Sequence, residues 1–254
     1  MRTLVRRLIG LAVFLGLWEA VGRLNIVDPY YLPPPSVVLV RFVELFGNPR
    51  FPGDVASTLL SWAIAIVLAT IIAVPLGTVL GSFRPLRLIS GPIIEFLRPL
   101  PTVALIPLVI LVIGSGAQTK ILLATFASTW PILFNTMYAF NEIDSQVIET
   151  ARAFRTRRVR LFSTVIMPSI APFVMTGVRL SASVALVVLV STEFLTGGTV
   201  GIGQFVYVWG SNAGRMDMVL AGTICTGIFG YLVNVGLLAG QRRWLKWSPT
   251  GGAV

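Results

Sequence analysis

The sequence predicts an all-α membrane protein, and three observations carry this prediction. Of its 254 residues 55% are hydrophobic and only 12% are charged, whereas about 25% are charged in a typical soluble domain. The mean hydropathy is +0.85. The apolar residues also gather in separate stretches close to the length of about 20 residues that a bilayer-spanning helix needs.

The charge and the residue inventory exclude several classes of function. The net charge is +10, which in a membrane protein reflects basic cytoplasmic loops, and no basic face carries the interleaved aromatic residues that stack nucleic-acid bases. The chain has no His, and its one Cys, Cys225, lies in an apolar run. We therefore expect no intrachain disulfide, no His general base and no Cys/His metal site.

The first predicted span covers residues 4–21 and has three arginines, Arg2, Arg6 and Arg7, at its start. A secretory signal peptide has a similar start. The segment that follows the apolar stretch, LWEAVGRL, has no small-x-small cleavage site, so we expect an uncleaved helix. Glu19 and Arg23 are four residues apart and predict an ion pair at its end. Residues 24–56 are rich in proline and predict an extended lead into a helix that lies on the membrane surface.

The second and third spans differ in regularity. The second covers residues 59–80, where Gly77 and Gly81 have the spacing that permits close helix packing. Residues 82–98 read as a polar break. The third, residues 99–113, contains Pro99, Pro101 and Pro107, the last at a point where a regular helix needs a backbone donor. Irregular backbone at membrane depth predicts a segment that lines a pathway; a kinked packing helix is the alternative.

Three further spans complete a six-helix prediction, at residues 121–140, 170–190 and 218–238, and the GGTVGIG run at 197–203 separates the last two. Six spans place both termini on one side. The segments on that side contain 14 Lys and Arg residues, and those on the other side contain 5. By the positive-inside rule both termini are cytoplasmic.

The basic loop between the fourth and fifth spans is the most informative segment. Five arginines fall within residues 152–160, so this segment cannot lie in hydrocarbon, where each charge costs at least about 2.5 kcal/mol. Val147, Ile148, Ala151 and Phe154 recur at helical spacing and predict a short amphipathic helix whose apolar face docks on another surface.

This loop resembles the EAA loop of the permease subunits of bacterial ABC importers. That pattern reads E-A-A, three residues, Gly, nine residues, I-x-L-P. Here Glu149, Thr150 and Ala151 begin it and Pro168 closes it, while Thr150 departs from the middle Ala and Arg155 replaces the Gly. Because the Gly permits a turn between two short helices, either the turn forms here without it or the helix continues.

The resemblance covers about residues 57–235. It includes RPLP at 98–101, ALIPLVILVIGSGAQTK at 104–120, WPILFNT at 130–136, NEID before the loop, Gly177-Val178-Arg179 after it, and Glu193 followed by GIG. Together these segments resemble the permease branch that serves nitrate, sulfonate, taurine, bicarbonate and thiamine-precursor pyrimidine uptake.

The resemblance implies the type I importer (MetI-like) permease fold in the bacterial inner membrane. It also implies the partners: a second permease copy, two cytoplasmic ATPase subunits and an external or lipid-anchored binding protein. The chain has no G-x-x-x-x-G-K-[ST] phosphate loop, so we expect a transport subunit that is not an enzyme, that binds no cofactor, and whose partner ATPase holds ATP and Mg. The expected regions are an N-terminal helix with a Pro-rich segment (1–56), a core permease domain (57–240) with the coupling loop at 141–168, and a cytoplasmic tail (241–254).

Two sets of residues are candidates for function. Those expected in the ATPase-coupling loop are Glu149, Thr150, Ala151, Arg152, Phe154, Arg155, Arg158 and Pro168. Those expected along the translocation pathway or its gate are Arg98, Pro99, Pro101, Pro107, Asn135, Arg179 and Glu193. Within the second set, Arg179 is either a contact for an anionic solute or a residue that snorkels to the membrane surface.

The predicted function is ATP-driven import of a small solute, anionic like a sulfonate, nitrate, bicarbonate or taurine. The same machinery importing a pyrimidine thiamine precursor, a riboflavin-like compound or an aromatic acid is the alternative. A stand-alone secondary transporter or channel is a more remote one, because the sequence shows no inverted repeat and no paired intramembrane carboxylates for ion coupling.

Overall fold

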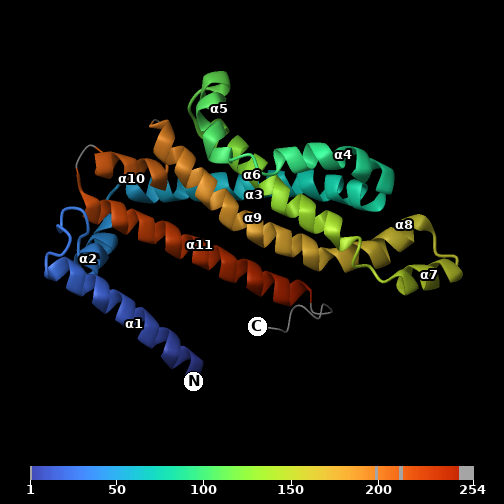
Figure 1. The fold of residues 1–254 in the computed structure, drawn as a ribbon, viewed down its shortest axis with the longest axis horizontal. Coiled ribbons are helices and arrows are strands. Elements are labelled where there is room, and N and C mark those ends of the chain that lie inside the picture. The colour runs from blue at the N-terminus through green and yellow to red at the C-terminus, as the bar shows by residue number, and fades with distance from the viewer. Residues whose placement is uncertain (1, 198–199, 212–213, 246–254) are drawn as a thin grey trace. The chain divides into compact units, whose positions relative to one another are not determined.

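The computed structural model describes residues 2–197, 200–211 and 214–245, and in these ranges the chain is helical without strands (Figure 1). The elements in chain order are α1 (Arg2–Arg23), α2 (Pro35–Leu45), α3 (Phe51–Ser82), α4 (Arg84–Leu97), the 3-10 helix η1 (Thr102–Leu105), α5 (Ile106–Ile113), α6 (Ala117–Ala139), α7 (Ser145–Ala153), α8 (Arg158–Leu161), the π-helix η2 (Phe162–Ile166), α9 (Met167–Thr196), α10 (Ile202–Ser211) and α11 (Met216–Trp244). The prediction of an all-α protein is confirmed.

Three continuous helices in the described chain are long and apolar enough to cross a membrane: Phe51–Ser82, Arg158–Thr196 and Met216–Trp244. A fourth crossing is available if Arg84–Leu97 and Thr102–Ile113, which are bent by 75° relative to each other, form one broken span. The full count of six spans and the cytoplasmic location of both termini stay predictions. Of the predicted tail, residues 246–254 lie outside the described residues.

The predicted polar break at 82–98 is helical, because α4 occupies it. Its charged residues Arg84, Arg87 and Glu95 recur at helical spacing, which confines them to one stripe, while Ile89 and Phe96 are 73% and 71% exposed. A segment with charges so placed is an amphipathic helix. The helix ends at Leu97, and Pro99 and Pro101 follow, neither of which has a backbone N–H that could continue the helical hydrogen bonds.

The interruption of helical structure lies before Pro107. α5 begins at Ile106, so Pro107 stands in its first turn, where a backbone N–H has no partner within the helix and proline is well tolerated. The expectation that Pro107 interrupts a helix is therefore wrong. The irregular backbone lies at residues 98–101, between α4 and η1.

The chain packs as two compact units. Unit 1 comprises Met1–Thr58 and Glu193–Phe229, and unit 2 comprises Leu59–Thr192 and Gly230–Val254. By these bounds α3, α9 and α11 each contribute residues to both units.

In unit 1 the core surrounds Phe51 and Phe205, whose ring centroids lie 4.9 Å apart. The predicted ion pair is present, with Arg23 Nε 2.6 Å from Glu19 Oε1. The Glu19 carboxylate also accepts hydrogen bonds from the backbone N–H and the hydroxyl of Ser36. The pair thus fastens the end of α1 to the start of α2.

In unit 2 small side chains allow α6 to approach α3 and α9 closely. Ser128 of α6 and Ser181 of α9 each donate a hydroxyl hydrogen bond to the backbone carbonyl of the other, and Trp62 of α3 donates from its indole to Ala182 O at 2.9 Å. Such polar contacts and small residues are the usual means by which helices associate in lipid, where the hydrophobic effect between them is absent.

Glycines mark the tightest contacts of α6. A Cβ on Gly77 would lie 2.7 Å from Thr136 Cβ, and one on Gly81 would overlap the ring of Phe140. The Gly77–Gly81 spacing therefore serves close packing against α6, as the sequence suggested. On the other side, a Cβ on Gly177 of α9 would lie 2.9 Å from Ile132 Cα.

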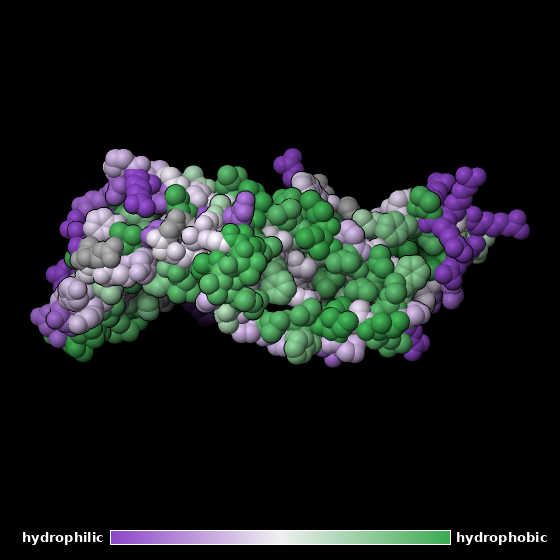
Figure 2. All heavy atoms as spheres, turned by 90° about the horizontal axis from the view of Figure 1, so that it is seen from above, coloured by the Kyte–Doolittle hydropathy of each residue, from purple (hydrophilic) through white to green (hydrophobic). Residues whose placement is uncertain are grey.

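Hydrophobic residues cover much of the visible face in Figure 2, and hydrophilic residues gather over α7 and α8 at one end of unit 2. The apolar surface includes α5, where Leu111 is 85% and Val112 is 76% exposed. A water-soluble protein rarely exposes large contiguous apolar patches, so this surface is one that lipid or another subunit covers.

We predict that Gly177→Ala lowers the thermal unfolding midpoint of the detergent-purified protein. The new methyl group meets the backbone of α6, which cannot move aside as a flexible side chain could, and overpacking of this kind costs about 1–3 kcal/mol. Gly236→Ala in α11 is the control, since nothing lies within 4 Å of its Cβ position. An unchanged midpoint for Gly177→Ala would show that α6 and α9 are not in close contact.

Candidate functional site

The predicted loop helix is present as α7. Asp144 caps its N-terminus, since the Asp144 side chain accepts a hydrogen bond of 2.8 Å from the backbone N–H of Gln146. This is the arrangement that satisfies an otherwise unpaired N–H in the first turn. The acidic NEID run before the loop therefore starts the helix.

Arg155 makes the turn that ends α7. Its φ is +52°, in the left-handed region. Its backbone N–H donates to Arg152 O at 2.8 Å, and that of Thr156 donates to Ala151 O at 3.1 Å. These two bonds form a Schellman motif, whose left-handed position is usually a glycine. The turn thus forms without the glycine, at the position where the EAA pattern has one.

The turn leaves α7 and α8 with an exposed apolar surface. Phe154 and Val159 are each 81% exposed and Val147 is 47% exposed, whereas Ala151 is half-buried. The expected coupling residues Glu149, Thr150, Arg152 and Arg158 are also exposed, as are Arg157 and Arg160. Large aromatic and branched side chains facing outward among arginines form a surface fit for a partner protein.

Pro168 lies in the first turn of α9, directly after the π-helix η2. A proline inside a continuous helix lacks a donor and its ring crowds the carbonyl four residues earlier. The wider π turn is one way in which a helix accommodates such an interruption, and Arg158–Thr196 consequently runs as one helical segment of 39 residues. The loop is therefore joined directly to a long apolar helix.

A cavity of about 620 Å³ opens in unit 2 beside the non-helical segment 98–101, which connects α4 and η1. Its lining residues come from three segments: Arg98, Leu100, Pro101, Thr102 and Val103; Ala127, Trp130, Pro131, Phe134, Asn135 and Tyr138 of α6; and Leu180, Val184 and Val188 of α9. The Arg98 guanidinium carbon lies 4.5 Å from the centroid of the Phe134 ring. The Asn135 side chain donates to Pro131 O at 2.8 Å.

The structure brings part of the expected pathway set together. Arg98, Pro101 and Asn135 line the cavity, whereas Pro99, Pro107 and Arg179 are outside its lining. Arg179 is half-buried in α9. Glu193 belongs to unit 1 and is fully buried in a separate polar cluster.

The aromatic wall of the cavity was not predicted from the sequence. Trp130, Phe134 and Tyr138 stand four residues apart on α6, which places them on one helix face. Their spacing was a visible signal, but a stripe of aromatic residues on an apolar helix usually marks core packing. The stripe lines a cavity because the non-helical segment 98–101 lies beside it.

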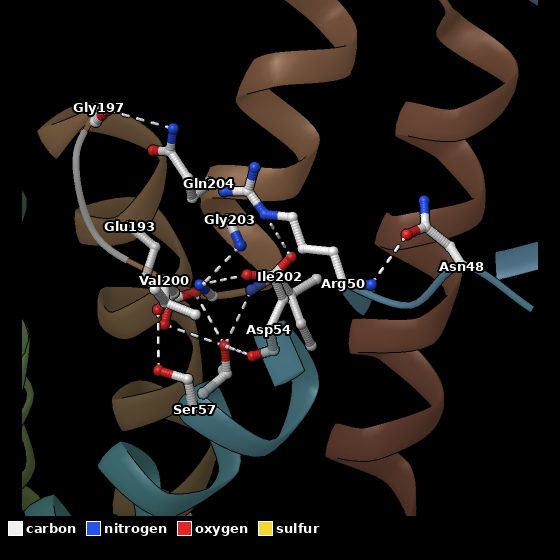
Figure 3. Close-up of polar contacts among 12 residues, drawn as sticks. Asn48, Arg50, Asp54, Ser57, Glu193, Gly197, Val200, Ile202, Gly203 and Gln204 are labelled. Atoms are coloured by element: carbon white, nitrogen blue, oxygen red, sulfur yellow. Dashed lines mark hydrogen bonds and ion pairs between the residues drawn. The ribbon is translucent and has the colours of Figure 1, made fainter. Parts of the chain in front are cut away.

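The polar cluster of unit 1, which we call the α10 cap, holds the start of α10 (Figure 3). Three consecutive backbone N–H groups donate to three buried side chains of α3 and α9. Gly201 donates to Asp54 Oδ1 at 3.1 Å, Ile202 to Thr58 Oγ1 at 3.0 Å and Gly203 to Glu193 Oε2 at 3.0 Å. The first N–H groups of a helix have no partner within it, and the helix dipole there favours negative charge.

Further contacts close the α10 cap. The Thr58 hydroxyl lies 3.0 Å from both carboxylate oxygens of Glu193, and Arg50 Nε lies 3.7 Å from Asp54 Oδ2. Asp54, Thr58 and Glu193 are each fully buried. A Cβ on Gly201 would overlap the Glu193 carboxylate, so the absence of a side chain there is a requirement of the cluster.

The carboxylates of the α10 cap do not amount to a metal site. Within the described ranges no group of three or more His, Cys, Asp or Glu residues is placed to hold a metal ion. Backbone N–H groups at the start of α10 already occupy one oxygen of each carboxylate, Asp54 Oδ1 and Glu193 Oε2. The cluster is therefore a device for holding a helix start in a fixed place.

We predict that Gly201→Ala destabilises unit 1. The methyl group displaces the Glu193 carboxylate from Thr58 and Gly203, and leaving a buried polar group unsatisfied costs about 1–3 kcal/mol. The measurement is the thermal unfolding midpoint in detergent, with Gly53→Ala as control because its Cβ position is open. Equal midpoints for Gly201→Ala and the native chain would mean that the α10 cap is not formed.

Comparison with known proteins agrees with the helical fold and with the family that the sequence resembles. The family described as "Binding-protein-dependent transport system inner membrane component" matches residues 65–246. The chain is 32% identical over 242 residues to the taurine transport system permease protein TauC of Escherichia coli, covering 93% of this chain and 87% of that protein. It is 28% identical to the putative aliphatic sulfonates transport permease protein SsuC of Bacillus subtilis, covering 93% and 85%.

Similarity extends to a nitrate permease and to a solved structure. The nitrate import permease protein NrtB of Synechocystis is 24% identical, with 91% of this chain and 85% of that protein covered. An inward-facing structure of the MetNI methionine ABC transporter matches with a TM-score of 0.68 at 20% identity, covering 76% of this chain and 95% of the other. That level of identity supports the fold alone. The chain therefore belongs to the family of binding-protein-dependent transport system inner membrane components, as a multi-pass permease subunit of the cytoplasmic membrane that is not itself an enzyme.

Proposed function

We propose that this permease imports a small anionic solute of the taurine, sulfonate or nitrate kind, and that α7 with its turn couples it to an ATPase. The observation that carries the coupling is the exposed apolar surface of Val147, Phe154 and Val159 in a basic loop. This surface adjoins a 39-residue helical segment that is apolar enough to cross the membrane. The solute class follows from the relatives that carry taurine, sulfonates and nitrate.

Two copies of the chain, two ATPase subunits and an external or lipid-anchored binding protein make up the proposed transporter. ATP and Mg belong to the ATPase subunits. The apolar residues exposed on α4 and α5, among them Ile89, Phe96 and Leu111, support burial against a second copy or lipid.

The proposed mechanism is alternating access. ATP binding closes the two ATPase subunits, and α7, docked in a groove on one of them, moves with that subunit. Because α8, η2 and α9 form one helical segment, movement of the turn reaches α9, which contributes Leu180, Val184 and Val188 to the cavity. Coupling of this kind is reciprocal, so docking of the loaded binding protein raises ATPase activity.

We predict that Glu149→Arg abolishes co-elution of the permease with its co-expressed ATPase. Glu149 is an exposed acid on α7, and reversing its charge places an arginine against the basic group that it meets on the ATPase, a mismatch that costs several kcal/mol. Glu142→Arg is the matched control, because Glu142 is exposed in the same loop before α7 begins. If both variants retained the ATPase, Glu149 would not be a contact in the interface.

We predict that Arg155→Gly retains the ATPase, whereas Arg155→Val loses much of it. A left-handed residue other than glycine costs about 1–2 kcal/mol, so glycine relaxes the turn and a β-branched valine strains it. Size-exclusion chromatography of the complex with each variant measures the effect. If the valine variant retained as much ATPase as the glycine variant, the shape of the turn would not matter for docking.

A further inference from the structure

We propose that the cavity of unit 2 is a binding site for a small organic anion, with the oxyanion on Arg98 and an apolar body against the aromatic wall formed by Trp130, Phe134 and Tyr138. This inference rests on the proposed function, since it places a contact for the imported solute within the permease itself.

The charged side chain that lines the cavity is positive. Arg98 lines it, and its lining residues include no Asp or Glu. In the part of the chain that the structure describes, the Arg98 guanidinium makes a cation–π contact with Phe134 and no hydrogen bond or ion pair. Arg98 is exposed and lines the cavity. A guanidinium that stacks on an aromatic face keeps its N–H donors in the plane of the group, where they can bind two oxygens of an oxyanion at once.

Further donors are available in the cavity wall. Trp130 contributes its ring to this wall, while its indole nitrogen is buried. Thr102 and Tyr138 add hydroxyl groups to the lining. An incoming oxyanion offers acceptors to these groups.

The walls specify more than an inorganic anion. Phe134 and Tyr138 stack with their ring centroids 6.2 Å apart, and Trp130 lies edge-on to Phe126 with centroids 5.5 Å apart. Leu180, Val184 and Val188 face the same cavity from α9. The volume of about 620 Å³ falls in the range of small-molecule sites. A bare nitrate ion would leave these apolar walls without contacts, whereas a short organic sulfonate or carboxylate would fill them.

The test uses the native permease–ATPase complex in detergent, without binding protein, and follows tryptophan fluorescence during titration with ethanesulfonate. We expect a saturable change, weakened about 10-fold or more in Arg98→Gln because hydrogen bonds to charged groups are lost, and weakened less in Arg98→Lys. Ethyl methyl sulfone, the neutral counterpart, should give no saturable change. Arg84→Gln, at the far end of α4 and outside the cavity, is the control and should bind as the native complex does.

Co-elution of the Arg98→Gln permease with its ATPase shows that the variant is folded and keeps the proposed function separate from this inference. Equal affinity of Arg98→Gln and native complexes for ethanesulfonate overturns the site. So does equal binding of the neutral sulfone, or the absence of any saturable change in the native complex at low ionic strength. In each of these cases an intact ATPase complex leaves the importer function standing.

Discussion

The structure is governed by the requirement that backbone N–H and C=O groups away from water find partners. Hydrocarbon offers none, so membrane-embedded backbone is helical except where protein or a water-filled cavity surrounds it. Here α3, Arg158–Thr196 and α11 are long and unbroken. The irregular backbone after Leu97 adjoins the cavity of unit 2, and the start of α10 donates to the buried side chains of Asp54, Thr58 and Glu193. The helix interruption at residues 98–101 thus lies beside a cavity, and the start of α10 lies against polar side chains.

Close packing of helices follows from the same setting. Glycine, alanine and serine at the contacts of α6 with α3 and α9 let the backbones approach, and the reciprocal bonds of Ser128 and Ser181 add polar contacts. The aromatic residues Trp130, Phe134 and Tyr138 of α6 line the cavity.

Much of this arrangement was predictable because it is local. The apolar runs, the helix before Arg155 and the Glu19–Arg23 pair depend on residues within a few turns of one another. The α10 cap was not predictable, since Thr58 and Glu193 are 135 residues apart and nothing near either residue indicates its partner. The helical character of α4 was visible in its charge spacing but was obscured by its three charged residues and two prolines. Pro107 was misjudged because a proline starts a helix as readily as it interrupts one, and only the position of the first turn decides between them.

The loop and the cavity together give a coherent account of transport. Arg155 supplies the turn of the EAA pattern through a left-handed conformation, so a departure in sequence leaves the expected shape in place. α9 then connects that turn to one wall of the cavity. We propose that a partner ATPase moves the loop, and that this movement changes access to the cavity.

The most direct test is uptake by liposomes that contain the permease with its ATPase. Radiolabelled taurine is added outside with the binding protein, and ATP is enclosed or omitted. The account predicts uptake only when ATP and the binding protein are both present, together with faster ATP hydrolysis when the loaded binding protein is added. Uptake of the solute in liposomes without ATP would contradict the account and favour a secondary carrier.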